Sequence, residues 1–359
     1  MFFETNREKL AAFSRLSKTA GARADYVQGG GGNTSVKLDG GLMAIKASGF
    51  CLKDIEPDRA YAVLNYEALR GFYFGNEPAG LGDVEKAGAA FTKENIVNVE
   101  GLAQLRPSVE AGFHSILKTF VLHTHSVYAN LAACSDRCRQ IAEKAFADAP
   151  YSWGWVPYTD PGANLTFAIR DELKRVEKET GRAPSIILMQ NHGVIAHDDD
   201  PDVCLRVHQD ANERLAAQFG LTLGSFPAVR VKTLENGLVA ADTPYLTSAL
   251  ASGKLSYQTL IEAPLYPDQM VFLIGTLFEN KKEPAEGEAV ADFATGELIF
   301  RMDAARAQVI TETLCAVAFI SEGIEKAGAG LSTMGEAAKN FIANWESEKY
   351  RKTLVGKKG

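Results

Sequence analysis

Residues 29–49 read GGGGNTSVKLDGGLMAIKASG. The apolar and β-branched residues in 33–37 and 42–46 predict two strands, and Asp39-Gly40-Gly41 predicts the turn between them. The stretch is therefore expected to form a strand–turn–strand unit that runs into a loop at 47–49.

Four glycines, Gly29–Gly32, precede the first of these strands. No GK[ST] follows them, so they do not form a Walker loop, and Ser35 stands where a dinucleotide fingerprint would need its third glycine. Two interpretations remain open: a flexible turn, or a loop whose backbone N–H groups approach an anion closely. Ser48-Gly49 is a second candidate of the same kind.

Helices and strands alternate around this unit without regular βαβ periodicity. Thr5 and Glu8 form a capping-box pattern, and the amphipathic helix that follows would end at Gly21. Further helices are predicted at 107–118, 126–133, 166–180 and 202–219, and further strands at 119–122 and 185–189. The pattern indicates an α/β fold in three layers, with a mixed, largely antiparallel sheet between helices.

The length of 359 residues suits two domains, and the irregular segment 222–245 is where we expect the boundary. We therefore predict one domain at 1–230 and a smaller α+β extension at 240–359. Apolar patterns in the extension predict one strand and two helices, at 271–275, 303–326 and 335–350. A solvated basic tail with Lys357 and Lys358 follows. The extension shows no signature of chemistry.

Composition excludes several classes of function. Hydrophobic residues make up 46% and charged residues 23%, as in folded globular proteins. The net charge of −7 would repel phosphate backbones and anionic lipids, so neither nucleic-acid nor membrane binding is expected. Five cysteines without a CxxC pair indicate reduced thiols. Because the start MFFETNREKL lacks a signal-peptide pattern, we expect a cytoplasmic protein.

Three histidines follow predicted strands. His123 and His125 lie two residues apart where one strand ends, so both side chains can point to the same face. His192 follows the strand at 185–189, and Gly193 allows a sharp exit. If the two strands are neighbours, three imidazoles converge with an open fourth position, as in catalytic zinc sites. The alternative is that these are ordinary hydrogen-bonded histidines at the edge of a core.

Glu110 lies thirteen residues before His123. Pro107 favours a helix start, which would place Glu110 in the first turn and His114 one turn later on the same face. Glu110 is then either a carboxylate stabilised by the helix dipole or, beside a metal, a ligand or general base.

These motifs occur together in one order. They are Gly32-Asn33-Thr34-Ser35, Ala47-Ser48-Gly49, Pro107-Ser108-x-Glu110 with His114, His123-x-His125, Tyr158…Pro161-Gly162 and Asn191-His192-Gly193. In this combination the chain resembles the class II aldolase/adducin family over about residues 5–220. Its GGGNTSVK form and long extension are most similar to the aldolase portion of bacterial rhamnulose-phosphate aldolase–dehydrogenase fusions.

The resemblance implies a cyclic homotetramer and a divalent metal, usually zinc, on His123, His125 and His192. It implies that Glu110 is the acid/base and occupies the metal when substrate is absent. The substrate phosphate would be held by three loops, which contain Gly32, Asn33, Ser48, Gly49 and Ser108.

Two positions depart from the family pattern. Val109 stands where phosphate-binding members commonly carry a second serine before the acid. The tyrosine that protonates the leaving aldehyde has no clear counterpart; Tyr151 and Tyr158 are nearest in sequence, and neither is assigned that role. Lys46 is interpreted as a strand residue near the anion site and not as a Schiff-base lysine.

The leading hypothesis is a zinc-type aldolase, an aldehyde-lyase that cleaves a ketose or ketose 1-phosphate through an enediolate stabilised by the metal. An epimerase or dehydratase on the same scaffold is the alternative, although Glu110 argues mildly against the epimerase. A third hypothesis is an adducin-like binding protein. Because adducin-type members lose the histidine ligands that this chain keeps, we favour an enzyme.

Overall fold

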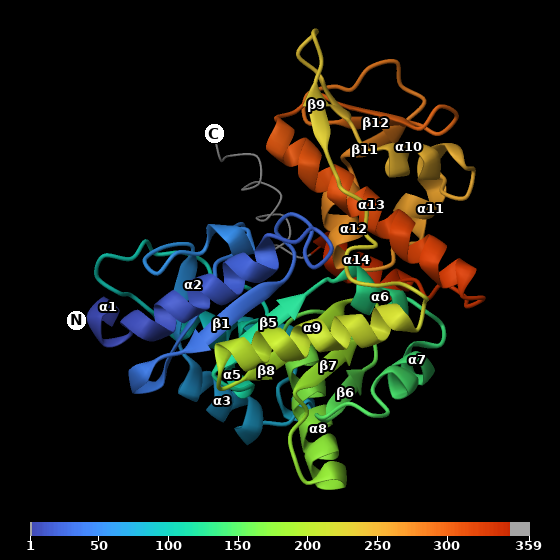
Figure 1. Cartoon of the computed structure of the whole chain (residues 1–359). Coiled ribbons are helices and arrows are strands. Elements are labelled where there is room, and N and C mark those ends of the chain that lie inside the picture. The colour runs from blue at the N-terminus through green and yellow to red at the C-terminus, as the bar shows by residue number, and fades with distance from the viewer. Residues whose placement is uncertain (1, 345–359) are drawn as a thin grey trace.

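Two β-sheets organise residues 2–344, the part of the chain that the computed structural model describes (Figure 1). The first sheet has eight strands in the spatial order β4-β3-β2-β1-β5-β8-β7-β6. These strands are β1 (Asn33–Lys37), β2 (Leu42–Lys46), β3 (Tyr61–Asn65), β4 (Ile96–Val97), β5 (Phe120–Thr124), β6 (Trp153–Val156), β7 (Ile186–Met189) and β8 (Gly193–Asp198).

The predicted strand–turn–strand unit is confirmed. β1 and β2 pair antiparallel, with Ser35 opposite Ile45, and the turn between them has Gly40 at φ 72° and Gly41 at φ 74°. These positive φ angles suit glycine because it lacks a Cβ. β6 and β7 form the one parallel pair of this sheet among the described residues. The sheet is therefore mixed and largely antiparallel, as predicted.

Helices cover both faces of the first sheet. They are α1 (Phe2–Thr5), α2 (Arg7–Gly21), α3 (Tyr66–Gly75), α4 (Val84–Glu94), α5 (Ala111–Ile116), α6 (Val127–Ala133), α7 (Cys138–Ala145), α8 (Ala163–Thr180) and α9 (Pro201–Ala217). On β5, Leu122 packs with residues of α2, α6, α7 and α9, whereas Val121 packs on the other face with α3, α5 and α8. Alternate strand residues thus supply two cores, and the three-layer prediction is confirmed.

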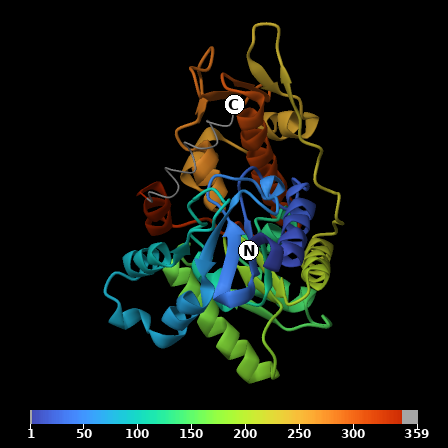
Figure 2. The same cartoon turned by 90° about the vertical axis from the view of Figure 1, so that its left-hand side faces the viewer.

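The second sheet has the order β11-β12-β13-β10-β9 and lies beyond one end of the first (Figures 1 and 2). Its strands are β9 (Val231–Thr233), β10 (Val239–Ala241), β11 (Leu277–Glu279), β12 (Ala289–Asp292) and β13 (Glu297–Phe300). Its helices are α10 (Pro244–Ala251), α11 (Tyr257–Glu262), α12 (Pro267–Leu273), α13 (Ala304–Lys326) and α14 (Glu336–Asn344).

α13 is the predicted long helix of this region. Within residues 2–344 it alone is long and apolar enough to cross a membrane by length and composition. In the fold, 72% of its most apolar window is buried, with Leu314 and Ile320 fully covered. It packs as the core helix of the second sheet. The five cysteines are free thiols, in agreement with the prediction.

Three local predictions are wrong or reach beyond the described residues. In place of the predicted strand at 271–275, residues 271–273 belong to α12 and residues 274–275 follow it, because Pro267 begins a helix whose apolar residues are buried on all sides. The predicted capping box is absent: Thr5 ends α1, and Asn6 precedes α2 without a side-chain cap. The helix predicted at 335–350 is α14 as far as Asn344, and its remainder and the lysine tail lie outside the described residues.

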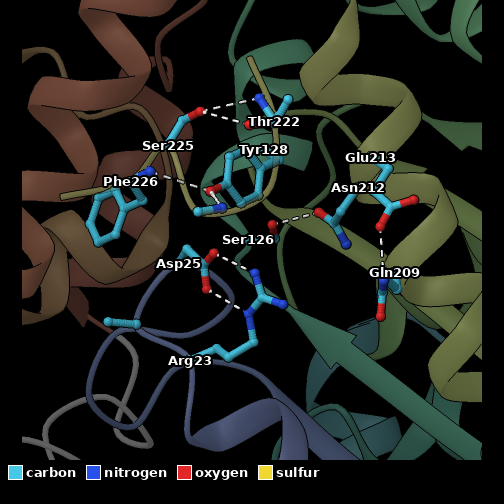
Figure 3. A network of polar contacts seen from close by, with 12 residues as sticks. Arg23, Asp25, Ser126, Tyr128, Gln209, Asn212, Glu213, Thr222, Ser225 and Phe226 are labelled. Atoms are coloured by element: carbon cyan, nitrogen blue, oxygen red, sulfur yellow. Dashed lines mark hydrogen bonds and ion pairs between the residues drawn. The ribbon is translucent and has the colours of Figure 1, made fainter. Parts of the chain in front are cut away.

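Tyr128 anchors the segment between the two sheets. Its hydroxyl accepts hydrogen bonds from the backbone N–H groups of Gly224 at 2.8 Å and Phe226 at 3.3 Å (Figure 3). We propose that the boundary between two units lies in this segment, residues 218–230, because α9 ends before it and β9 begins after it. The first unit contains the first sheet with α1 to α9, and the second unit contains the second sheet with α10 to α14.

Candidate metal centre and active site

The three predicted histidines converge in the structure. His123 lies within β5, His125 directly follows it, and His192 lies in the turn that joins β7 to β8. Since β8 pairs with β5, this turn falls beside the end of β5. Each histidine offers a ligand nitrogen within 4.8 Å of the others, and all three side chains are buried. The structure therefore brings together the residues that the spacing selected.

Hydrogen bonds assign the ring nitrogens of two of these histidines. His123 Nδ1 lies 3.1 Å from the carbonyl of Val194, and His125 Nδ1 lies 2.5 Å from Asp268 Oδ2. Both partners can only accept, so each Nδ1 carries the hydrogen and each Nε2 a lone pair. The two Nε2 atoms face each other at 3.1 Å. Two facing lone pairs repel, and a shared cation relieves that repulsion.

Glu110 lies beside this cluster. Its Oε1 is 3.2 Å from His192 Nε2, its Oε2 is 3.6 Å from His123 Nε2, and Asn33 Nδ2 donates to Oε2 at 2.5 Å. Burial opposes the charge, but His123 and His192 hold the pKa of Glu110 well below its usual range. The carboxylate is therefore charged where the three imidazoles meet.

Two buried polar atoms at this point lack a well-formed hydrogen bond among the described residues: Glu110 Oε1, whose nearest ionisable neighbour is His192 Nε2 at 3.2 Å, and His192 Nδ1. Such atoms are costly in a folded protein unless an ion or water completes them. Burial also lowers the pKa of His123 to about 3, which keeps the ring neutral as a metal ligand requires. Three imidazoles and one carboxylate are ligands that suit a divalent metal such as zinc.

The local structure around Glu110 differs from the prediction. α5 begins at Ala111, so Glu110 precedes the helix instead of lying in its first turn, and Pro107 forms a bridge to Ala47. The backbone N–H of His114 still donates to the Glu110 carbonyl at 3.4 Å. The His114 ring bonds Asn33 Oδ1 and thereby holds the amide that donates to Glu110.

α9 fixes the end of β5. Thr124 Oγ1 and His208 Nε2 are 2.7 Å apart. Ser126 Oγ donates to Asn212 Oδ1 at 2.5 Å (Figure 3). These residues flank His125 and are buried. The backbone that carries two of the candidate ligands is therefore fastened on both sides of His125.

A cavity opens onto the cluster. The predicted substrate-binding residues all line it, namely Gly32, Asn33, Ser48, Gly49 and Ser108, and so do Glu110, His125 and His192. Ser108 Oγ accepts from Asn33 Nδ2 at 3.1 Å and from the Glu110 backbone N–H at 3.3 Å. The loops that the sequence singled out thus meet at one cavity.

The glycine run is packed, not free. Gly32 has φ 63°, and a Cβ there would lie 2.5 Å from the His123 carbonyl. A Cβ on Gly29 would strike Val309 of α13, and one on Gly31 would strike Asp268 of α12. The glycines therefore permit the close approach of β5 and of the second unit, which the flexible-turn interpretation did not anticipate.

Two lining residues bear on the departures from the family pattern. Val109 lines the cavity, whereas Tyr151 and Tyr158 do not. Tyr151 donates to Asp210 on α9 at 2.6 Å. The Lys46 ammonium, also at the cavity, donates to the carbonyls of Gly30 at 3.2 Å and Phe50 at 2.8 Å, so it fastens two of the loops.

The second unit contributes residues that the sequence analysis did not find. Pro267 of α12 and Ile342 of α14 line the cavity, and Asp268 bonds His125. An aspartate after a proline at a helix start is common, so nothing in the local sequence distinguished Asp268. The sequence analysis found no signature of chemistry in this region, and the structure places three of its residues at the cavity or at His125.

Comparison with known proteins identifies the family. The family model described as the class II aldolase and adducin N-terminal domain matches residues 10–218. The chain belongs to this family. A search of curated proteins gave no match.

Several solved structures resemble part of this class II aldolase family member. The N-terminal class II aldolase domain of a conserved protein from Thermoplasma acidophilum is 22% identical, over 56% of this chain and 90% of that one, with a TM-score of 0.47. A sugar-phosphate aldolase from Thermotoga maritima is 17% identical, over 58% and 94%, with a TM-score of 0.39. An L-fuculose 1-phosphate aldolase is 19% identical, over 61% and 89%, with a TM-score of 0.37. The similarity to aldolase–dehydrogenase fusions stays a prediction.

Proposed function

We propose that the protein is a metal-dependent aldolase, an aldehyde-lyase that cleaves a ketose or ketose 1-phosphate. The observation that carries the proposal is the convergence of His123, His125, His192 and Glu110 at one cavity. Membership of the class II aldolase and adducin family gives this arrangement its chemical context.

The three histidines would hold a divalent metal, for which we propose zinc. When bound, the metal supplies Lewis-acid stabilisation of negative charge that develops on substrate oxygens. His123 and His125 present Nε2 lone pairs because their Nδ1 atoms are committed to Val194 and Asp268. Neutral imidazole and carboxylate ligands are those that zinc prefers in catalytic sites.

Glu110 would move the proton. Its Oε2 is held by Asn33, whereas Oε1 faces His192 Nε2 at 3.2 Å, on the side of the candidate metal ligands, and is the oxygen that we assign to proton transfer. A carboxylate in its charged form can accept a proton once a substrate hydroxyl lies within hydrogen-bond distance. Ser48, Gly49 and Ser108 would orient the far end of the substrate, where a phosphate needs several donors.

Two other functions are weighed on the same residues. An epimerase or dehydratase would use the same metal ligands and Glu110, and only the products distinguish them from an aldolase. An adducin-like binding role is the weaker alternative, because a binding protein has no need for three histidines and a charged carboxylate buried together.

We further propose a homotetramer that acts in the cytoplasm on small sugars or sugar phosphates, without nucleic-acid or membrane partners. The tetramer rests on the family architecture alone. Light scattering of the purified protein at micromolar concentration tests it, and a monomeric mass would contradict it.

The decisive experiment measures metal content and aldehyde release in one preparation. Protein purified without chelators is analysed for metal and then offered ketose 1-phosphates and the corresponding free ketoses, with and without a chelator. We expect about one zinc per chain and chelator-sensitive release of an aldehyde. Absence of metal would refute the proposal, and isomerised or dehydrated product without aldehyde would favour the alternative enzymes.

A further inference from the structure

One candidate metal ligand is held by the second unit. Asp268, the second residue of α12, has a fully buried side chain, and its Oδ2 lies 2.5 Å from His125 Nδ1. The segment that matches the family model ends at residue 218, and Asp268 lies fifty positions beyond that end. The carboxylate at this ring nitrogen is therefore supplied by a part of the chain outside the family domain.

We propose that Asp268 is a positioning residue for metal binding, and that the second unit is consequently part of the metal site. The inference rests on the proposed function, since it assumes a metal at the histidine cluster. Asp268 accepts the Nδ1–H of His125, so the ring has one tautomer and its Nε2 lone pair is directed at His123 Nε2, 3.1 Å away. A carboxylate partner of this kind also raises the basicity of a ligating imidazole.

The surroundings restrict the His125 ring to this orientation. Tyr266, the residue before α12, presents its ring edgewise to His125 with 6.2 Å between ring centroids. The N–H of His125 has a carboxyl acceptor that cannot be replaced by water without opening the contact, because both side chains are buried. The His125 ring is thus packed by Tyr266 and hydrogen-bonded by Asp268, both of the second unit.

A separate set of contacts docks the second unit on the glycine run. Glu312 of α13 accepts from the Gly29 backbone N–H at 3.2 Å, and Val309 occupies the space where a Gly29 side chain would lie. Gly31 leaves room for the Asp268 carboxylate in the same way. α12 and α13 of the second unit therefore pack against the glycine run that lines the cavity. This packing fixes the position of Asp268.

The competing interpretation is that Asp268 and His125 merely tie the two units together. Loss of that tie would lower the stability of the protein without a specific effect on the metal. Gln269 provides a matched control for this case. It is the next residue of α12, is equally buried, and its side chain bonds the Leu265 N–H at 2.8 Å and the Leu260 carbonyl at 2.7 Å, neither of which belongs to a histidine.

The experiment compares zinc affinity in the full-length protein and its variants by competition with a chromogenic chelator. Asp268→Ala is expected to weaken zinc binding by about 10–100-fold, the usual effect of losing such a partner. Asp268→Asn keeps an uncharged acceptor of the same shape, so we expect a smaller loss of about threefold to tenfold. Gln269→Ala should lower the urea midpoint but bind zinc like the wild type.

Cobalt provides a second readout that a merely structural tie would not change. The visible absorption of bound Co²⁺ reports ligand geometry, and it should shift in Asp268→Asn but not in Gln269→Ala. If Asp268→Ala does not fold, the asparagine variant decides, because it preserves volume and one hydrogen bond.

The outcomes separate the two proposals. Wild-type affinity and an unchanged cobalt spectrum in the Asp268 variants would overturn the positioning role and leave the aldolase proposal standing. Equal losses in Gln269→Ala and the Asp268 variants would also overturn it, in favour of a structural tie. A wild-type protein that binds no zinc would refute the proposed function and this inference with it.

Discussion

Gly31→Ala tests the docking of the second unit with a single methyl group. Gly31 is not among the glycines with positive φ, so alanine is compatible with the backbone, and the effect comes from the side chain alone. An ideal Cβ there would overlap Asp268 Oδ2 and lie 3.1 Å from both the Gln28 carbonyl and His125 Nδ1. To restore an ordinary contact of 3.4 Å, the carboxylate or the loop must move by roughly 1 Å in this close-packed region.

The size of the effect follows from that displacement. If Asp268 retreats, its distance of 2.5 Å from His125 Nδ1 grows to about 3.5 Å, at which a hydrogen bond is effectively lost. Zinc affinity should then fall by about 10–100-fold, as expected for a lost ligand partner. That range corresponds to about 1.4–2.7 kcal/mol. Overpacking should also lower the free energy of unfolding by about 1–3 kcal/mol.

The assay is zinc competition and urea unfolding on Gly31→Ala, Asp268→Ala and the double variant. If the methyl acts by displacing Asp268, the double variant should bind zinc no more weakly than Asp268→Ala, because the displaced group is already gone. Gly71→Ala is the control, since a Cβ on that α3 glycine meets nothing within 4 Å. Losses that multiply in the double variant, or wild-type affinity in Gly31→Ala, would refute the reasoning.

Three further predictions concern the candidate site and the stability of the fold. Glu110→Gln should keep zinc but lose about 10²–10⁴-fold in turnover; turnover within a few-fold of wild type, at equal metal content, would remove Glu110 from proton transfer. Val109→Ser should tighten a ketose 1-phosphate by about tenfold, or about 1.4 kcal/mol, if the hydroxyl adds one hydrogen bond to phosphate; failure of millimolar inorganic phosphate to compete in either protein would exclude a phosphate site. Burial lowers the pKa of His197 and of His208 from 6.5 to about 3, so unfolding binds protons between these values, and stability falls as pH drops below 6.5. At pH 5 each of these two histidines should lower the free energy of unfolding by about 2 kcal/mol relative to a pH well above 6.5. In metal-free protein the urea midpoint of His208→Gln should therefore depend less on pH than that of wild type.

The sequence was informative where local pattern and fold agree. The strand pair around Gly40-Gly41 was predictable because turn residues and alternating apolar residues act over a few positions. The convergence of His123 and His125 followed from strand geometry, and that of His192 needed only that β8 lie beside β5. These features depend on short-range rules that one sequence can reveal.

The sequence pattern gave a wrong secondary structure where a segment is buried on all sides. The run 270–273 is uniformly apolar, and such a run fits a buried strand or a buried helix equally well by periodicity. Here Met270 and Phe272 pack against α14, and Leu273 packs into the core of the second unit, so a helix satisfies both contacts. The start of α5 was misplaced because Pro107 fits a strand bridge as well as a helix.

The division of the chain into two sheets does not divide the hydrophobic core. Tyr128 and Leu131 of α6 belong to the same buried cluster as Leu314 and Ile320 of α13, although α6 follows directly on the strand that carries the candidate ligands. The helix that follows β5 is thus buried on one side by the extension and on the other by the core of the first sheet. The same extension supplies the carboxylate at His125 Nδ1 and fills the space beside the glycine run. Packing and ligand orientation at the end of β5 therefore draw on the extension as well as on α9 and β8, and in this chain the family domain is completed by residues beyond its own boundary.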